Sequence, residues 1–428
     1  MLQTLRNAWR IEEIKRKILF TLLIILLYRL GNAIPVPYVN IAALQSYFAM
    51  LQNTVLGLLD VMSGGAFSNA TIFALSIQPY INASIIIQLL CIAIPALERM
   101  SKEEGEEGRK KIAAITRYVT VAIGLLQGFG FYMLIKNNGI LVADAQSSIW
   151  AAIVIILTFT SGSALIMWLG EQITEHGIGN GISMILFASI ISRLPTSIVT
   201  SVRNIILGQL QWWVLVLMIL GALAIIVLIV FVNDSERRIP VQYAKRVVGR
   251  KMYGGQSTHL PMKVNMSGVM PIIFAQSIAS VPATIAAFTG KTDGWVSTWF
   301  GTNSIPYAIV YFLLIIFFAY FYSTIQFNPI EVANNLKKNG GYIPGFRPGK
   351  PTSEFIHKVL NKITLFGAIY LGIIAVVPIL VAHFSQSAAL TGISLGGTSI
   401  IIVVGVALET VRALEAQMLM RNYKGFLD

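Results

Sequence analysis

The sequence predicts an all-α, polytopic membrane protein with ten transmembrane helices in two halves of five. Three observations predict this class. The 428 residues are 55% hydrophobic and only 12% charged, whereas soluble domains carry about 25% charged residues. The apolar residues are gathered in runs close to the ~20 residues that cross a bilayer. The basic residues fall mainly on one side of these runs. The single cysteine, Cys91, excludes an intramolecular disulfide.

Ten apolar runs are candidate spans. The first is short, and the fifth carries Arg193 and Pro195, which makes it the least regular. The predicted spans are, in chain order, Ile18–Ile34, Phe73–Leu97, Ile112–Ile135, Ser148–Leu169, Gly181–Val202, Trp212–Val232, Ser267–Phe288, Tyr307–Phe327, Ile363–His383 and Gly396–Met418. The first run has no small-residue cleavage site, so we interpret it as a retained helix rather than a signal peptide.

The distribution of basic residues orients these spans. With the amino terminus inside, the inner segments hold 25 of the 32 Lys and Arg residues, and the outer loops hold three. This bias follows the positive-inside rule and predicts that both termini are cytoplasmic. The chain then divides into a cytoplasmic segment (1–17), two five-span halves (18–202 and 212–418) and a cytoplasmic tail (419–428). An odd number of spans per half inverts the second half relative to the first, and inverted repeats place a pathway at their interface.

One short segment interrupts the apolar pattern between the first two spans. Residues 56–73, "LGLLDVMSGGAFSNATIF", begin as an apolar helix and then break at a cluster of glycine, serine and asparagine. The segment is too short to span a bilayer, yet too apolar for an ordinary loop. Irregular backbone at membrane depth is tolerated only where it lines a cavity or is buried in protein.

Two predicted cytoplasmic loops are unusually long, at 233–266 and 328–362. Loops of this length in a compact protein are commonly functional. "IPVQYAKRV" (239–247) alternates apolar and polar residues and predicts a strand or hairpin. "GGYIPGFRPG" (340–349) combines turn formers with prolines of fixed φ and should hold one shape, with Arg347 at its tip. We interpret the loops as two stiff basic fingers that dock a cytoplasmic partner; the alternative is binding to lipid alone.

The sequence shows no catalytic constellation and predicts neither an enzyme nor a cofactor. The ionisable residues inside spans are few: Arg29, Arg117, Arg193, Glu409 and Arg412. Glu409 and Arg412 are spaced i, i+3 and are expected to pair on one helix face. Coupled transporters usually need ionisable groups at membrane depth. We therefore favour passive conduction over the alternative, an ion-coupled secondary transporter with inverted repeats.

The second span has a mixed face. Ile81 and Ile85 lie four residues apart, with Gln78, Asn82 and Gln88 around them. Polar groups in a span usually face protein or water rather than lipid. The pattern fits the wall of a conducting path and equally fits ordinary packing between helices.

Six stretches together resemble the SecY family, the channel subunits of the bacterial Sec protein translocase. They are "QPYINASIIIQLL", "GIGNGIS", "RRIPVQYAKR", "VNMSGVMPIIFAQS", "GGYIPGFRPG" and "GGTSIIIVV", and they run in order along essentially the whole chain. The resemblance implies a central pore between the halves that passes unfolded secretory polypeptides and releases apolar segments sideways into lipid. It also implies that the broken segment, about 55–72, is a re-entrant half-helix called the plug, which we expect to be held by few strong contacts.

The resemblance assigns roles to particular residues. The plug residues are Leu59, Asp60, Gly64, Gly65 and Phe67. The pore ring, a set of six apolar side chains at the narrowest point, falls on Ile81, Ile85, Leu186, Ile190, Ile273 and Ile402. Gln88 and Gln276 are expected at the lateral gate, or else in internal helix–helix hydrogen bonds. The residues expected to dock a motor or a ribosome are Arg238, Lys245, Arg246, Arg250, Arg347 and Lys350.

The resemblance also implies partners and a location. The expected partners are the small membrane subunits SecE and SecG, the motor ATPase SecA, the ribosome, the translocating polypeptide with its signal sequence, and SecDF and YidC. The net charge of +13 adds anionic phospholipid to this set. The expected location is the bacterial cell membrane.

Overall fold

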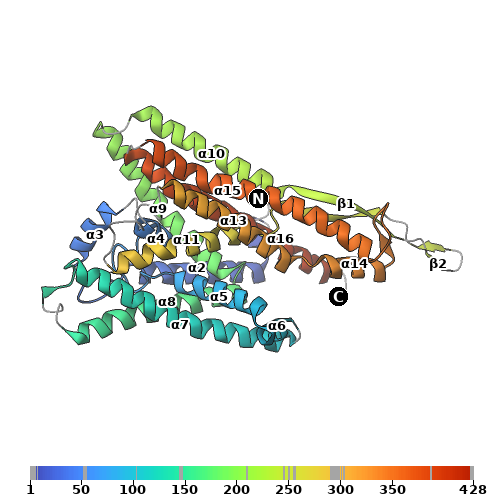
Figure 1. The fold of residues 1–428 in the computed structure, drawn as a ribbon, viewed down its shortest axis with the longest axis horizontal. Coiled ribbons are helices and arrows are strands. Elements are labelled where there is room, and N and C mark those ends of the chain that lie inside the picture. Colours follow the sequence, from blue (N-terminus) through green and yellow to red (C-terminus); the bar gives the residue numbers. More distant parts are fainter. Residues whose placement is uncertain are drawn as a thin grey trace.

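The computed structural model is a bundle of helices with a small group of strands at one end (Figure 1). It describes residues 6, 8–51, 55–102, 104–143, 148–208, 211–243, 246–248, 251–253, 257–289, 299, 301, 304–385 and 388–424.

In the part of the first half that the structure describes, the chain is helical apart from turns, short links and isolated bridges between Pro35 and Thr71 and between Val39 and Leu141. Its helices are α2 (Glu12–Gly31), α3 (Ile41–Met50), α4 (Val55–Met62), α5 (Gln78–Ala93), α6 (Pro95–Lys102), α7 (Gly105–Asn137), α8 (Ile149–His176) and α9 (Gly181–Ile206). Asn180 begins α9, because its side chain accepts hydrogen bonds from the amides of Ile182 and Ser183. The "GIGNGIS" stretch is thus a turn and helix cap. Gly181 also allows close packing, since a Cβ there would lie 1.9 Å from the carbonyl oxygen of Gly170.

The second half adds strands to its helices. The elements are α10 (Trp212–Asp234), β1 (Glu236–Tyr243), β2 (Arg246–Val248), β3 (Lys251–Tyr253), β4 (Ser257–Lys263), α11 (Met270–Thr289), α13 (Ile305–Gln326), α14 (Pro329–Lys338), β5 (Gly341–Tyr342), α15 (Lys350–Ser385) and α16 (Ala388–Lys424).

Each of the ten predicted spans overlaps a helix of the structure. Within the described ranges, six helices are long and apolar enough to cross a membrane, and a seventh span results if α5 and α6, bent by 106°, count as one. The number of ten therefore stays a prediction. The predicted start of the second span, Phe73, is five residues too early. Residues 63–77 form turns and an isolated bridge, and helix α5 begins only at Gln78.

The outer surface of the bundle is apolar, as expected for helices that face lipid. On α10, Leu220 is 61% exposed and Phe231 is 73% exposed. The exposed apolar side chains continue along α2, where Leu22, Leu26 and Leu30 are all more than half exposed. Such a surface would aggregate in water, so the structure supports the multi-pass membrane class.

The two long loops form one unit rather than two separate fingers. β1 pairs antiparallel with β4, with Ile239 opposite Leu260, and also with β5, with Gln242 opposite Tyr342. The sheet order β4-β1-β5 therefore joins the first loop to the second. The strand predicted in 239–247 is present as β1, which covers 239–243 of that stretch. The expectation of two separate fingers is wrong, because strand pairing and a shared core join the two loops. That core consists of Ile239, Val241, Met262, Ile343, Ile356 and Leu360.

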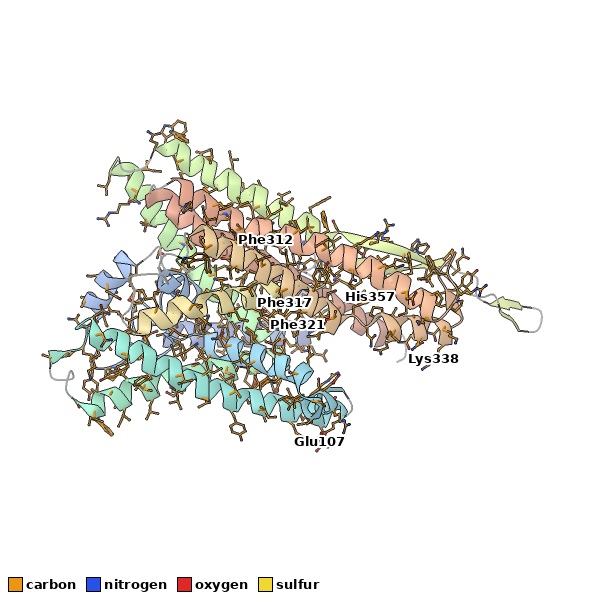
Figure 2. All side chains as sticks on the ribbon, viewed as in Figure 1. Glu107, Phe312, Phe317, Phe321, Lys338 and His357 are labelled. Atoms are coloured by element: carbon orange, nitrogen blue, oxygen red, sulfur yellow. The ribbon has the colours of Figure 1, made fainter. Side chains whose placement is uncertain are left out.

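Two charged segments predicted on the inner side lie toward the same end of the molecule. Glu107, from the segment after α6, and Lys338, from the loop with α14, both appear at the end that carries the strands (Figure 2). This arrangement agrees with the orientation that the basic residues predict.

Candidate functional site

Helix α4 and the turn after it are inserted among the long helices. α4 contacts α9, α11 and α16, three helices that each carry at least one predicted ring residue. Gly64 and Gly65 have φ of +69° and +89°, a region that favours glycine. The helix therefore ends at Met62 and the chain reverses at the two glycines. The predicted half-helix over about 55–72 is present but shorter, since its helical part ends at Met62.

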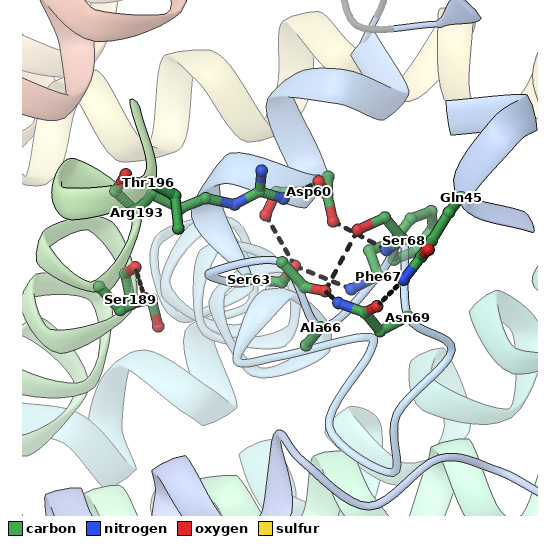
Figure 3. A network of polar contacts seen from close by, with 12 residues as sticks. Gln45, Asp60, Ser63, Ala66, Phe67, Ser68, Asn69, Ser189, Arg193 and Thr196 are labelled. Carbon is green, nitrogen blue, oxygen red and sulfur yellow. Dashed lines mark hydrogen bonds and ion pairs between the residues drawn. The ribbon is translucent and has the colours of Figure 1, made fainter. Parts of the chain in front are cut away.

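Asp60 on α4 makes the most specific contacts of this segment (Figure 3). One carboxylate oxygen, Oδ1, accepts a hydrogen bond of 2.8 Å from the amide of Ser68. The other, Oδ2, forms an ion pair with the guanidinium of Arg193 on α9. The expectation that few strong contacts hold this segment is wrong, because the sequence could not show that Arg193 lies beside Asp60.

A second set of polar contacts holds the turn itself. The hydroxyl of Tyr28 on α2 donates a hydrogen bond of 3.3 Å to the carbonyl oxygen of Ser63. The same hydroxyl lies 2.7 Å from Oγ of Ser189 on α9. Ser63 Oγ in turn accepts a hydrogen bond of 3.1 Å from the amide of Phe67. The turn is thus tied to α2 and α9 at once.

The stretch that follows the turn is part of a hydrophobic core. The ring of Phe67 lies 4.1 Å from that of Phe131 on α7 and 5.3 Å from that of Phe48 on α3. Ala66, Phe67 and Ala70 are at most 3% exposed. Phe67 therefore packs into the fold, so the plug prediction is best fitted by the shorter piece, α4 with its glycine turn, which polar contacts hold against α2 and α9.

The six predicted ring residues come together in one buried cluster. They lie on α5, α9, α11 and α16, and none is more than 4% exposed. Met62 of α4 belongs to the same cluster. A cavity of about 190 Å³ adjoins α4, with Leu59, Met62, Leu186 and Ser277 among its lining residues. The structure thus gathers these side chains beside the plug segment, and their action as a ring stays a prediction.

The two predicted gate glutamines have different partners. Gln88 on α5 accepts a hydrogen bond of 2.7 Å from the hydroxyl of Tyr322 on α13. Gln276 on α11 donates to the sulfur of Met62 on α4 at 3.5 Å. Gln88 therefore bridges the two halves of the chain, whereas Gln276 contacts the plug segment. Sequence reasoning missed Tyr322, because a tyrosine in an apolar span gives no signal of its partner.

The ionisable residues inside the bundle are mostly paired. Arg117 on α7 lies 2.9 Å from Glu171 on α8. Arg412 on α16 pairs with Asp234 at 2.6 Å and also donates to the carbonyl oxygen of Asn233. Arg412 makes its salt bridge with Asp234 at the end of α10, and the expected partner Glu409 interacts with Arg412 only through a longer-range Coulombic attraction. Among the described residues, no group of His, Cys, Asp and Glu could hold a metal ion.

The predicted docking residues are distributed over the strand-bearing end. Arg238 on β1 is exposed and donates a hydrogen bond of 2.7 Å to Glu236. Arg347 and Lys350 are exposed in and after the turn that follows β5. Arg246 begins β2, whose backbone alone is described. Lys245 and Arg250 lie outside the described residues.

These features define a multi-pass, mostly helical membrane protein in which a short helix is inserted among the spans beside a buried apolar cluster. A SecY family model matches residues 71–411, and the chain belongs to the SecY family.

The relatives match over the whole chain. The protein translocase subunit SecY of Streptomyces coelicolor is 45% identical over 444 residues, and that of Mycobacterium tuberculosis is 44% identical over 446 residues; in both cases 100% of each chain is covered. Among solved structures, a protein-conducting channel matches with a TM-score of 0.68 and 17% identity, covering 94% of this chain and 92% of that chain. Sec61 in a canine ribosome-channel complex matches with a TM-score of 0.65 and 16% identity, with the same coverage. These structures share the fold.

Proposed function

We propose that this chain is the central protein-conducting channel subunit of a Sec translocase. It would pass unfolded secretory polypeptides across the bacterial cell membrane and release apolar segments into lipid. The observation that supports this most strongly is the insertion of α4 among three helices that carry ring residues. The relatives, named as translocase subunits and identical at 44–45% over full length, support the same activity.

The apolar cluster suits a gasket around a moving chain. Branched aliphatic side chains offer no fixed hydrogen bonds or charges, so they do not select one sequence. A narrow apolar passage also loses its water, which opposes the flow of ions. We place this gasket at the six ring residues and the plug, α4 with its glycine turn, on the outer side of it.

The remaining parts of the proposal concern topology and partners. We assign the strand-bearing end and both termini to the cytoplasm, and the halves 18–202 and 212–418 to inverted repeats. The similarity to Sec61 in a canine ribosome-channel complex supports the ribosome as a partner. We place its docking at the strand-bearing end, where arginine and lysine would meet RNA phosphate. SecA would dock there as well, with SecE, SecG, SecDF and YidC as membrane partners. Translocating polypeptides with their signal sequences and anionic phospholipid complete the set.

Substitution of Ile402 tests the channel proposal. Ile402→Asn puts an amide into the gasket, and burial of a poorly satisfied polar group destabilises the closed state by about 1–3 kcal/mol. The open population then rises by about one to two orders of magnitude. The measurements are export of a reporter with a defective signal sequence and ion conductance in planar bilayers. Ile402→Val, which keeps an apolar side chain, should leave both near the wild-type level. If Ile402→Asn changed neither measurement while Ile402→Val abolished export, the gasket would be ruled out.

The hydrogen bond between Gln88 and Tyr322 predicts a second effect. We place the lateral gate where α5 and α7 meet α11 and α13, since α11 contacts α5 and α7 there. Tyr322→Phe removes the bridge between α5 and α13, and a hydrogen bond of this kind stabilises by about 1 kcal/mol. Sideways opening should become about fivefold easier, so a reporter with a weakly apolar signal segment should be exported faster.

Tyr320→Phe is the matched control for the gate. Tyr320 lies on the same helix, but its hydroxyl donates to the carbonyl oxygen of Asn361 on α15 rather than to the gate. Equal effects of the two tyrosine substitutions would show that the hydroxyl at 322 has no special part in opening.

A further inference from the structure

Asp60 and Arg193 are an unusual pair for the inside of a membrane bundle. They are separated by 133 residues in the chain, and their side chains are only 11% and 32% exposed. A charge in such a place is costly unless it is paired and hydrogen-bonded. Asp60 is satisfied on both oxygens, by the amide of Ser68 and by Arg193. Arg193 keeps one buried nitrogen, Nε, without a partner, so Asp60 is the principal stabilising contact of its guanidinium.

The face of α9 that carries Arg193 also fits the glycine turn sterically. A Cβ on Gly64 would lie 2.9 Å from the carbonyl oxygen of Ser189 and equally close to Oγ of Ser192. A Cβ on Gly65 would lie 3.2 Å from the Arg193 guanidinium. The turn therefore sits directly against one turn of α9, and the ion pair lies at this contact. Displacement of α4 has to separate the two charges.

We propose that Asp60 and Arg193 form a charge latch, in which Arg193 positions the plug and sets the threshold at which the channel opens. The inference rests on the proposed function and adds a particular pair of residues to it. Arg193 lies three residues after the ring residue Ile190 on α9, so the latch joins the plug to the helix of the gasket itself. A partly buried pair has a recognisable signature, because loss of one partner leaves the other charge uncompensated, whereas loss of both does not.

The test measures exposure of α4 directly. In a background with Cys91→Ser, which removes the only cysteine, Leu59→Cys places a reporter on α4 beside the cavity. The rate of labelling by a membrane-impermeant maleimide is then measured in proteoliposomes without any polypeptide substrate. Asp60→Asn and Arg193→Gln should each raise the rate by about tenfold, the scale of coupled neighbours. Asp60→Asn keeps an oxygen for the Ser68 amide, so the local turn is retained.

Three further variants make the result specific. The double variant Asp60→Asn with Arg193→Gln should label no faster than the faster single variant, since the two residues act as one unit. Arg193→Lys keeps the positive charge and should stay within about threefold of the background, because Arg193 contacts Asp60 through one nitrogen and one oxygen, a pairing that an ammonium group can also make. Arg203→Gln removes a positive charge from an exposed position of the same helix and should leave the rate unchanged.

The outcomes separate the latch from the channel proposal. Unchanged labelling in both single variants, or effects that simply multiply in the double variant, would overturn the latch. Conductance in planar bilayers is recorded for the same proteins. If labelling rises as expected and conductance does not, the ion pair holds α4 in place as proposed, but the channel proposal and the opening threshold fail. If both rise together, the latch controls the pore.

Discussion

Replacement of residues 55–62 by a glycine-serine segment of equal length is expected to give a channel that leaks ions at rest. The replacement removes α4, and with it the Asp60 side of the latch and the Met62 side chain from the apolar cluster. The long helices do not depend on α4 for their ends, since it is a separate helix of eight residues. Single-channel recording in planar bilayers should show openings without any polypeptide substrate, at least tenfold more often than in the wild type.

A companion variant shows why the replacement has to end at Met62. Deletion of residues 66–70 removes Phe67, which is buried between Phe48 and Phe131. Loss of a buried phenylalanine costs about 3–5 kcal/mol, so this deletion should lower the thermal unfolding midpoint. The replacement of 55–62 should lower it as well, because it removes the buried Leu56 and Met62 side chains and leaves Arg193 without Asp60, but the long helices should stay folded. A resting conductance equal to that of the wild type, in a protein lacking α4 that still unfolds cooperatively, would rule out the plug. A partial leak counts in its favour, because a neighbouring segment can fill part of the gap.

The positions of the helices and of the first strand could be predicted from the sequence, because these elements depend on residues that are close together in the chain. Apolar runs of sufficient length form helices in lipid whatever their neighbours, and charge bias needs only counting. The alternation in "IPVQYAKRV" likewise predicts a strand from adjacent residues alone. The structure has a helix at each predicted span and a strand in the predicted stretch, whereas the orientation and the number of ten spans stay predictions. The start of the second span was misplaced because residues 73–77 are apolar but turn, and composition does not record a turn.

The pairings could not be predicted, because each joins residues far apart in the chain. Asp60 meets Arg193, Gln88 meets Tyr322, and Arg412 meets Asp234 rather than its helical neighbour Glu409. An i, i+4 or i, i+3 rule finds only partners on the same helix. The pairing of β1 with β5, which joins the two long loops in one sheet, is also a contact between residues far apart in the chain. The contacts on which the plug and gate proposals depend could therefore not be predicted from the sequence pattern.

Arg347→Glu is expected to block motor-driven export while leaving the fold and the membrane insertion of this chain intact. The backbone around Arg347 is held by its neighbours: Thr352 Oγ1 donates a hydrogen bond of 2.8 Å to the Arg347 carbonyl oxygen, and the ring of Phe346 lies 4.2 Å from that of Phe355. Gly345 and Gly349 have φ of +87° and +107°, a region that favours glycine and lets the chain turn on both sides of Arg347. The Arg347 side chain itself is exposed. The substitution thus reverses the charge of an exposed side chain while the backbone turn is held by its neighbours. In the described structure, the Arg347 side chain makes no internal contact that would be lost.

Two control variants separate a specific contact from a general charge effect. Lys358→Glu makes the same change in net charge at an exposed position of α15 in the same unit, and export should stay within about twofold of the wild type, since scattered surface charges contribute little. Arg347→Lys keeps the charge but loses the planar fork that binds carboxylates in a bidentate manner, so it should retain part of the activity. The measurement is export of a SecA-dependent substrate into inverted membrane vesicles. With glutamate at position 347, export should fall by at least 100-fold, because a favourable charge contact that docking buries becomes a like-charge repulsion with the partner. The fall should be much smaller with lysine at that position. If the glutamate variant exported normally, or if Lys358→Glu were equally damaging, Arg347 would have no particular place in docking, and the strand-bearing end would act through its net charge alone.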